Sequence, residues 1–265
     1  MIIDFHAHIY PEKIAEKATK NIGEFYNAPM ALAGSVKGLI ESGEKIGVTK
    51  YIVHSTATKP EQVQSINNFI MSEVNAESRF VGFGTMHPLY KEFEAEIARM
   101  KEMGLKGIKL HPDFQKFEAD AEIMDPIYDC FAKNNLPVLF HAGDYRYDFS
   151  GPERIGHVLD KHPDLTVIAA HFGGYTEWDK SYQFLCGRKV YFDTSSTLWR
   201  LPYDQALKMI DKHGVDQFLF GVDYPMWDHA GELERFYKLG LSAEDHQKIL
   251  FENGKKLLEG LGVSV

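Results

Sequence analysis

The sequence predicts a single domain over residues 1–265, folded as a (β/α)8 barrel. Eight short apolar segments recur along the chain, most of them rich in β-branched or aromatic residues. Such segments are typical of parallel strands that are covered on both faces. Segments with helical spacing of apolar residues lie between them, and the length suits one barrel with few insertions.

The candidate strands span residues 2–5, 50–54, 80–85, 107–110, 137–140, 165–170, 189–193 and 217–222. The long connection after the first strand should hold helices at 12–23 and 36–45. Further helices are expected at 92–103, 121–134, 152–162 and 204–213, three of which are followed directly by Gly104, Pro163 or Gly214 as stop signals.

The last helix should begin at Ser242, because this residue and Asp245 have the spacing of an N-cap and its partner. We expect it to run through Leu257 and Leu258, with a break near Asn253-Gly254. An open doubly wound sheet is the alternative fold, but no glycine-rich phosphate-binding motif follows the first strand.

The composition argues against several classes of partner. The net charge is −9 without any block of like charges, which disfavours nucleic acid. The chain has no run of 18 or more apolar residues, so a membrane-spanning helix is not expected. Cys130 and Cys186 are too few for a disulfide framework, and the first strand leaves no room for a secretory leader. We therefore expect a cytoplasmic protein with a small-molecule substrate; a homodimer stays open, because barrels of this kind often pair.

Histidines gather at the ends of the predicted strands, where such barrels carry their active sites. Seven of the 12 histidines lie there: His6, His8, His54, His87, His111, His141 and His171. Asp193 and Asp223 end the last two strands. Scattered surface histidines would not show this pattern, so it predicts one polar site at the mouth of the barrel.

Strand alternation predicts which of these side chains share a face. In the first strand, Asp4 should share a face with His6 and His8. Similar triplets are Val167, Ala169 and His171 in the sixth strand, and Leu219, Gly221 and Asp223 in the eighth. Each polar residue would then stand above apolar or small side chains, as a barrel filled in layers requires.

Imidazole and carboxylate groups suit a divalent metal of borderline softness in a site with an open position. His6, His8, His141 and Asp223 would supply three neutral ligands and one anion. Such an ion polarises a carbonyl and lowers the pKa of bound water. His171 would act as general acid or base, or as a fifth ligand, and Asp223 could also accept a proton from the attacking water.

Six motifs lie in order along nearly the whole chain, at residues 4–8 (DFHAH), 107–112 (GIKLHP), 141–143 (HAG), 170–174 (AHFGG), 221–225 (GVDYP) and 248–254 (KILFENG). Together they resemble the amidohydrolase superfamily, in the branch that includes aminocarboxymuconate-semialdehyde decarboxylase. The resemblance implies a zinc-like ion, with Mn²⁺ as the alternative, held by His6, His8, His141 and Asp223. It also implies that His171 matches a histidine that some members use in catalysis.

Other residues carry weaker expectations. Lys109 could be carbamylated and bridge two metals, as in some members of the superfamily, but the branch that the chain resembles uses one metal, so one ion is favoured over two. Otherwise Lys109 would pair with an acid or contact a substrate carboxylate. His111 could contact substrate or form part of the wall, and Arg146 is a candidate clamp for a carboxylate.

The remaining polar residues have structural expectations. His54 and His87 are expected to be satisfied structural histidines, Asp4 to orient groups lower in the barrel, and Asp193 to hydrogen-bond the ligands. The later loops carry aromatic residues that would line a substrate pocket or pack against one another: Tyr145, Tyr147, Tyr175, Trp178, Trp199 and Trp227.

Two catalytic functions fit these residues. The first is a metal-dependent hydrolase of an amide, lactone or ester bond in a small, carboxylate-bearing substrate, acting through metal-activated water. The alternative is a metal-dependent, non-oxidative decarboxylase of an aromatic or unsaturated acid. A barrel that only binds metal or ligand is disfavoured, because an apparent base accompanies the ligands.

Overall fold

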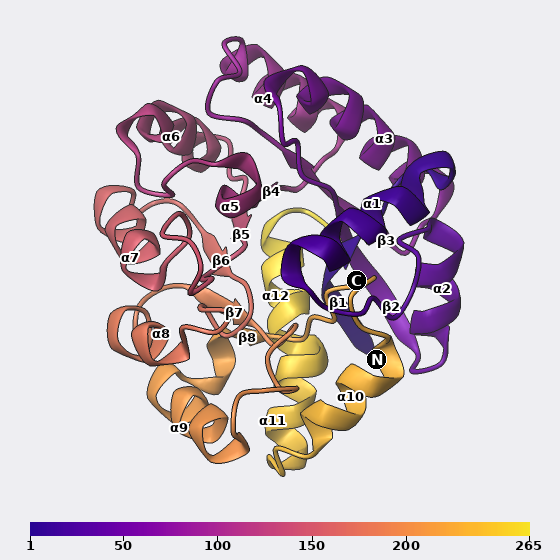
Figure 1. Cartoon of the computed structure of the whole chain (residues 1–265), viewed down its shortest axis with the longest axis vertical. Helices are drawn as coiled ribbons and strands as arrows, with labels where there is room; N and C mark the ends of the chain where they lie inside the picture. Colours follow the sequence, from indigo (N-terminus) through magenta and orange to yellow (C-terminus); the bar gives the residue numbers. More distant parts are fainter.

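The computed structural model describes residues 1–265 and contains eight parallel strands in chain order, arranged as a nearly closed barrel (Figure 1). The predicted fold class is therefore confirmed. Each predicted strand overlaps an observed one, although the last four are shorter than expected. The strands are β1 (Ile2–His8), β2 (Val48–His54), β3 (Phe80–Thr85), β4 (Gly107–Leu110), β5 (Val138–Phe140), β6 (Val167–Ala169), β7 (Tyr191–Asp193) and β8 (Phe218–Leu219).

The barrel closes between β1 and the segment that follows β8. Phe5 N–H donates to Phe220 O at 2.8 Å, and Asp223 N–H donates to His6 O at 2.8 Å. His8 N–H donates in turn to Tyr224 O at 2.8 Å. These bonds extend the seam beyond the two residues of β8, and they bring Asp223 beside the histidines of β1.

Helices surround the barrel and none is long and apolar enough to cross a membrane (Figure 1). All helices expected at particular positions are present within a few residues. The α-helices are α1 (Glu12–Tyr26), α2 (Val36–Glu44), α3 (Val63–Ala76), α4 (Phe93–Met103), α5 (Pro112–Gln115), α6 (Asp125–Lys133), α7 (Pro152–Lys161), α8 (Trp178–Phe184), α9 (Tyr203–His213), α10 (His229–Tyr237), α11 (Ala243–Gln247) and α12 (Asn253–Gly260).

The C-terminal helices begin where the sequence predicts. Ser242 caps α11, and its hydroxyl accepts a hydrogen bond from Asp245 N–H at 3.1 Å. The break expected near Asn253-Gly254 is instead a π-helical turn over Lys248–Glu252, directly before α12. Gly254 allows α12 to approach the barrel, because a Cβ at this position would lie 2.5 Å from Phe5 Cε2.

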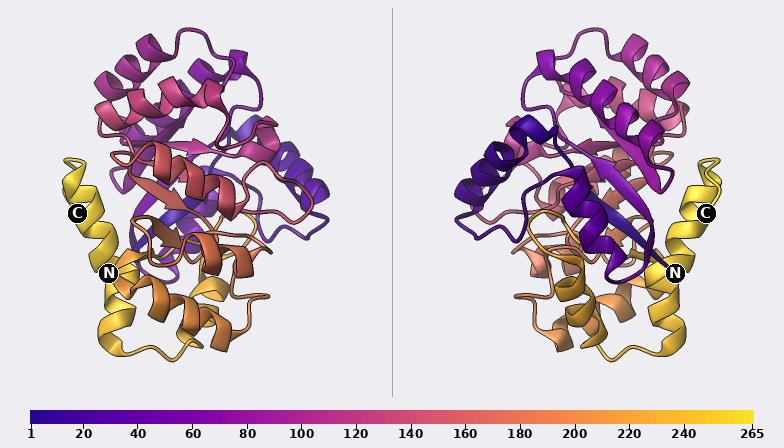
Figure 2. Two further views of the ribbon diagram at one scale, coloured as in Figure 1. Left: turned by 90° about the vertical axis from the view of Figure 1, so that its left-hand side faces the viewer. Right: turned by 90° about the vertical axis from the view of Figure 1, so that its right-hand side faces the viewer.

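The two ends of the barrel are covered differently. Figure 2 shows α12 at one end and α1 at the other. Phe251, Leu257 and Leu258 of the C-terminal helices join the buried cluster inside the barrel, which includes Ile3 and Leu219. This apolar plug closes the end near α12, so the polar groups of the barrel face the end covered by α1.

Two of the predicted shared faces are wrong. In β1 the pairing with β2 shifts register between Asp4 and Ala7, and this bulge puts Asp4 on the outer side, against His229 of α10. Ile3 and Phe5 then lie inside with His6 and His8. In β6, Ile168 lies inside, and Val167 and Ala169 pack in the outer cluster.

Candidate metal centre

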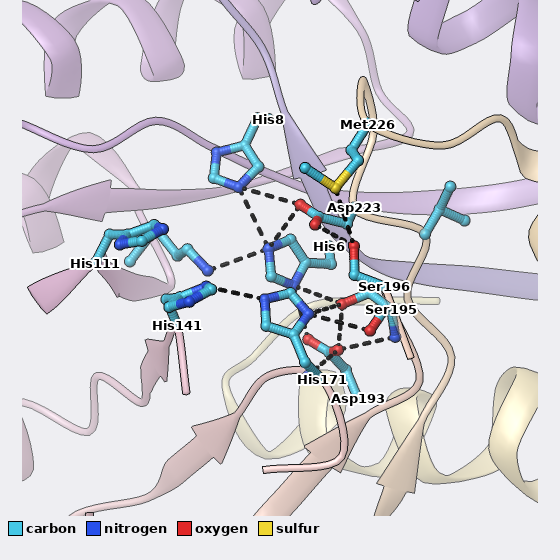
Figure 3. Close-up of polar contacts among 12 residues, drawn as sticks. His6, His8, His111, His141, His171, Asp193, Ser195, Ser196, Asp223 and Met226 are labelled. Carbon is cyan, nitrogen blue, oxygen red and sulfur yellow. Dashed lines mark hydrogen bonds and ion pairs between the residues drawn. The ribbon is translucent and has the colours of Figure 1, made fainter. Parts of the chain in front are cut away.

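Polar side chains from several strand ends converge at the mouth of the barrel (Figure 3). His6 and His8 come from β1, Asp193 from β7, and His171 and Asp223 from the segments after β6 and β8. All except Asp223 are buried. The site therefore lies where the sequence predicts it, on residues that are as many as 217 positions apart in the chain (Asp223 and His6).

Three potential ligand atoms form a compact triangle. His6 Nε2 lies 3.3 Å from His8 Nε2 and 3.4 Å from Asp223 Oδ1, and His8 Nε2 lies 3.5 Å from the same oxygen. Zinc–nitrogen bonds of 2.0–2.1 Å in a tetrahedron place neighbouring ligands about 3.3–3.4 Å apart. The spacing of these three atoms fits a zinc-sized ion without movement of the strands.

The hydrogen bond between His6 and Asp193 directs the other ring nitrogen of His6 into the triangle. Its Nδ1–H donates to Asp193 Oδ2 at 2.8 Å, so a neutral ring keeps its lone pair on Nε2, inside the triangle. Asp193 Oδ1 also accepts from the N–H groups of His171 and Ser195, both at 3.0 Å. Asp193 thus orients several parts of the site, as expected from the sequence.

The electrostatics favour neutral imidazoles beside one carboxyl. Burial lowers the pKa of His6 and His8 well below its ordinary value, and the nearby Lys109 adds to this effect. Burial raises the pKa of Asp223 to about 7, against the opposing effects of the Ser196 hydroxyl and Lys109. Neutral histidines and an ionisable carboxylate are the protonation states that a divalent ion requires.

Two site residues have left-handed backbone conformations. His171 has a φ of 62° and Asp223 a φ of 63°, a region that side chains other than glycine seldom adopt. At His171 this conformation ends the alternation of β6 and turns the imidazole toward the mouth. His171 therefore does not share a face with Val167 and Ala169, which pack outside the barrel. Such strain is commonly stored at functional sites.

His171 is held in one tautomer. Its Nδ1 lies 3.1 Å from the backbone oxygen of Ser195, which can only accept, so Nδ1 carries the hydrogen. The lone pair on Nε2 then accepts a bond from His141 Nδ1–H at 3.0 Å. Burial lowers the pKa of His171 to about 4, partly opposed by Asp193, so the ring is a neutral proton acceptor.

His141 lies at the rim of the triangle and not within it. Its Nδ1 faces His171, and its Nε2 lies 3.4 Å from the hydroxyl of Tyr26. The His141 ring also stacks on the ring of His111, with the two centroids 3.9 Å apart and 6° between the planes. His111 accepts a bond from Phe114 N–H on Nδ1, and its Nε2 lies 2.9 Å from the same tyrosine hydroxyl.

Tyr26 is a site residue that sequence reasoning missed. The helical pattern predicts an end near residue 23, whereas α1 continues for another turn and brings Tyr26 over the mouth. Tyr26, His8 and Asp223 are among the residues that line a hollow of about 20 Å³. No motif marks this tyrosine, and its role follows only from where α1 packs.

The sequence model of the amidohydrolase family matches residues 3–260. The chain belongs to the amidohydrolase family. The predicted resemblance is thereby confirmed, and with it the assignment of the chain to an enzyme family.

Solved structures that are similar to this amidohydrolase support the barrel fold. An uncharacterized TIM-barrel protein from Bordetella bronchiseptica is 19% identical, with 99% of each chain covered and a TM-score of 0.78. A dihydroxybenzoic acid decarboxylase from a Polaromonas species, with bound manganese, is 16% identical over 99% of this chain and 98% of that one, with a TM-score of 0.76. A candidate 2-pyrone-4,6-dicarboxylic acid hydrolase from Pseudomonas putida has the same identity and coverage, with a TM-score of 0.69.

Lys109 places an amine beside the triangle in this amidohydrolase. It is fully buried, and its Nζ lies 3.1 Å from His6 Nε2. Burial lowers the pKa of Lys109 to about 8, although Asp193 and Asp223 oppose the shift. The amine therefore faces the cluster directly, where it can meet a substrate group or a second ligand.

Arg146 is already paired. Its guanidinium makes three hydrogen bonds to the Asp144 carboxylate, at 2.9, 3.2 and 2.6 Å, and a fourth to Phe25 O at 2.5 Å. Arg146 lines a hollow of about 490 Å³. Four of the six aromatic residues expected in a pocket line it too: Tyr145, Tyr175, Trp199 and Trp227. Trp178 is instead buried, and its indole N–H donates to His171 O at 3.0 Å.

The structure places the two remaining strand-end histidines differently. His87 Nδ1 accepts a bond from Leu89 N–H at 3.2 Å, as expected for a structural residue. His54 is completely buried beside His6 and His8, yet neither of its ring nitrogens has a hydrogen-bond partner. The expectation that His54 is satisfied by its surroundings is therefore wrong.

Proposed function

We propose that this amidohydrolase is a metal-dependent hydrolase that cleaves an amide, lactone or ester bond of a small, carboxylate-bearing substrate. The observation that carries the proposal is the triangle of His6 Nε2, His8 Nε2 and Asp223 Oδ1, with separations of 3.3–3.5 Å at the mouth of the barrel. A divalent ion held there would supply a Lewis acid that polarises a carbonyl and acidifies water.

We propose one ion, Zn²⁺ in preference to Mn²⁺, because two imidazoles and a carboxylate at this spacing suit zinc. The further ligand that the sequence predicts is His141, with His171 as the other candidate. Both stand next to the triangle through their mutual bond. The manganese in the similar decarboxylase supports a divalent ion without deciding which one.

The protein groups around the triangle have separate proposed roles. His171 accepts or returns a proton through Nε2, because Ser195 O holds its other nitrogen. Asp223 is a second acceptor, and the Ser196 hydroxyl, 2.5 Å from its Oδ2, fixes the orientation of the carboxylate. Lys109 and His111 face the substrate, and Arg146 contacts a carboxylate as part of its pair with Asp144.

Decarboxylation of an aromatic acid is the second candidate. It is favoured by the aromatic hollow, which shares Tyr26 and Met226 with the small hollow beside Asp223, and by the buried cation Lys109. Flat apolar walls with a nearby cation suit an aromatic carboxylate in either reaction. A screen of lactones, amides and aromatic acids, with product identification, distinguishes hydrolysis from loss of CO₂.

Elemental analysis of the purified protein tests the metal centre. We expect about one zinc per chain in the native protein, and loss of both metal and activity in His6→Ala and Asp223→Ala, with circular dichroism unchanged. His87→Ala is the matched control, because this histidine lies outside the cluster and should leave the metal content intact. Full metal content in both site variants would refute the assignment.

A further inference from the structure

A second cavity, of about 330 Å³, lies along one face of α1 and shares no lining residue with the aromatic hollow. Ala18, Asn21, Ile22 and Phe25 line this α1 cavity from the helix. These positions are three or four residues apart, so their side chains share one face of α1. The opposite wall comes from residues that follow β2 and β4. A space of this size lies within the range of small-molecule pockets, about 300–1,000 Å³.

The metal triangle lies between the α1 cavity and the aromatic hollow. The small hollow of about 20 Å³ at the triangle shares His8, Ile22 and Phe114 with the α1 cavity. The same small hollow shares Tyr26 and Met226 with the aromatic hollow. A substrate whose reacting carbonyl lies at the triangle can therefore extend into two separate spaces.

Buried polar atoms without partners are concentrated around the α1 cavity. His8 Nδ1, Thr56 Oγ1 and Asp113 Oδ1 are buried and have no hydrogen-bond partner, and all three residues line the cavity. Such groups are few in folded proteins, and each calls for an explanation. A bound molecule with hydrogen-bonding groups would supply the missing partners.

The lining of the α1 cavity suits an uncharged molecule. Tyr10 and Phe114 add to the apolar face of the helix. The buried acid in the lining is Asp113, whose second carboxylate oxygen accepts a bond from the Ser150 hydroxyl at 2.5 Å. The one lysine or arginine in the lining is Lys116, which is exposed and therefore belongs to the outer edge. A carboxylate deep in this cavity would meet an acid and apolar walls.

We propose that the α1 cavity binds an uncharged, mainly apolar arm of the substrate, while the substrate carboxylate lies in the aromatic hollow beside Arg146. The substrate class is then an open-chain amide or ester with two unlike arms, one apolar and one acidic, on opposite sides of the scissile bond. A hydroxyl or amide on the apolar arm pairs with Thr56 or Asp113. This inference rests on the proposed hydrolase function and specifies its substrate.

Alkyl hydroxamates of increasing chain length test the cavity, because the hydroxamate chelates zinc and the alkyl chain is free to enter the α1 cavity. Calorimetry on the full-length, zinc-loaded protein gives the Kd of each compound from acetohydroxamate to hexanohydroxamate. In the wild type, each added methylene should lower the Kd by about fourfold. Ala18→Leu fills the cavity, so this gain should largely disappear while the Kd of acetohydroxamate stays unchanged.

Ala28→Leu is the matched control, because it makes the same change in the lining of the aromatic hollow and should keep the gain with chain length. Should Ala18→Leu fail to fold, Asn21→Trp fills the α1 cavity from an exposed position of the helix. Metal content is measured in every variant and should equal that of the wild type.

Two further probes test the polarity of the arm. Adipic monohydroxamate, whose chain ends in a carboxylate, should bind more weakly than hexanohydroxamate. Tighter binding that disappears in Lys116→Met would overturn the uncharged arm. Among hexanohydroxamates with one hydroxyl on the chain, at least one should bind more tightly than the plain compound in the wild type and lose this advantage in Thr56→Val. Equal binding of all of them would overturn the proposed hydrogen bond.

The outcomes separate this proposal from the proposed function. If zinc binds but chain length does not change the Kd, or if Ala28→Leu abolishes the gain and Ala18→Leu does not, only the role of the α1 cavity is overturned. If the wild type binds no divalent ion, the metal-dependent function is overturned. The metal-free proteins are then titrated with hexanamide, which should bind to the wild type and Ala28→Leu but not to Ala18→Leu. Absence of that pattern would overturn the role of the cavity as well.

Discussion

Individual residues in the centre are chemically prepared by hydrogen bonds from their neighbours. Asp193 accepts a hydrogen bond from His6 Nδ1–H, and Ser195 O accepts one from His171 Nδ1–H. Each bond leaves the lone pair of the opposite nitrogen toward the middle of the site. A neutral ring with a fixed tautomer presents one lone pair for an ion or a proton, and that of His171 now accepts a bond from His141 Nδ1–H.

His171 gives the prediction at this scale. His171→Asn should retain the metal and lose about 10²–10⁴-fold in kcat, which is the usual contribution of general acid–base catalysis. Metal content and steady-state rates are measured on the same preparation. An unchanged rate would exclude the residue from the mechanism, and loss of the metal would identify it as a ligand.

At the scale of secondary-structure elements, Asp4 connects β1 to its neighbours. Its Oδ1 accepts from His6 N–H at 2.9 Å and from Val222 N–H at 3.0 Å, and its Oδ2 lies 3.1 Å from His229 Nε2. The carboxylate therefore stabilises the bulge in β1, the seam after β8 and the start of α10. It supports the metal centre from outside the barrel.

Asp4→Ala should lower the free energy of unfolding by about 3 kcal/mol or more, because it leaves buried donors of His6, Val222 and His229 unpaired. Asp4→Asn is the matched variant: its amide oxygen can still accept from the two backbone N–H groups, so the loss should be smaller. Urea denaturation of the metal-free proteins measures both. Equal stability of Asp4→Ala and wild type would contradict this account of the seam.

For the whole molecule, the concentration of buried neutral histidines makes the fold sensitive to acid. Burial lowers the pKa of both His171 and His213 to about 4, and it also lowers the pKa values of His6, His8 and His54 well below the ordinary value. In the folded chain these histidines stay neutral at a pH near 6.5, where the same histidines begin to bind protons in the unfolded chain. Stability from these groups is complete above pH 6.5 and is lost as the pH falls toward 4.

We therefore expect the metal-free protein to lose stability between pH 6.5 and 4, by up to about 1.4 kcal/mol per pH unit for each such histidine. Burial raises the pKa of Asp113 and Asp223 to about 7 and of Glu232 to about 8, which acts in the opposite sense. The histidines outnumber these carboxyls, so acid should destabilise. Unfolding curves at several pH values test this, and a constant free energy over the range would contradict it.

Local patterns were sufficient for the order of strands and helices and for the gathering of His6, His8 and Asp223. Periodicity identifies each strand, and parallel strands of a barrel end at the same rim. The same patterns failed at Asp4 and at His171, because a bulge and a left-handed residue interrupt alternation without a sequence signal. Tyr26 was missed because the length of α1 depends on its packing over the mouth.

The sequence by itself determined the fold class, the family and the rim at which polar residues collect, because these follow from spacing along the chain. Only the tertiary structure decided which nitrogen of His6 and of His171 carries the hydrogen, that His54 is buried without partners, and that Arg146 is paired with Asp144. Those properties depend on contacts between segments far apart in the chain. Burial and hydrogen-bond partners, which set charge and tautomer, exist only once the barrel has closed.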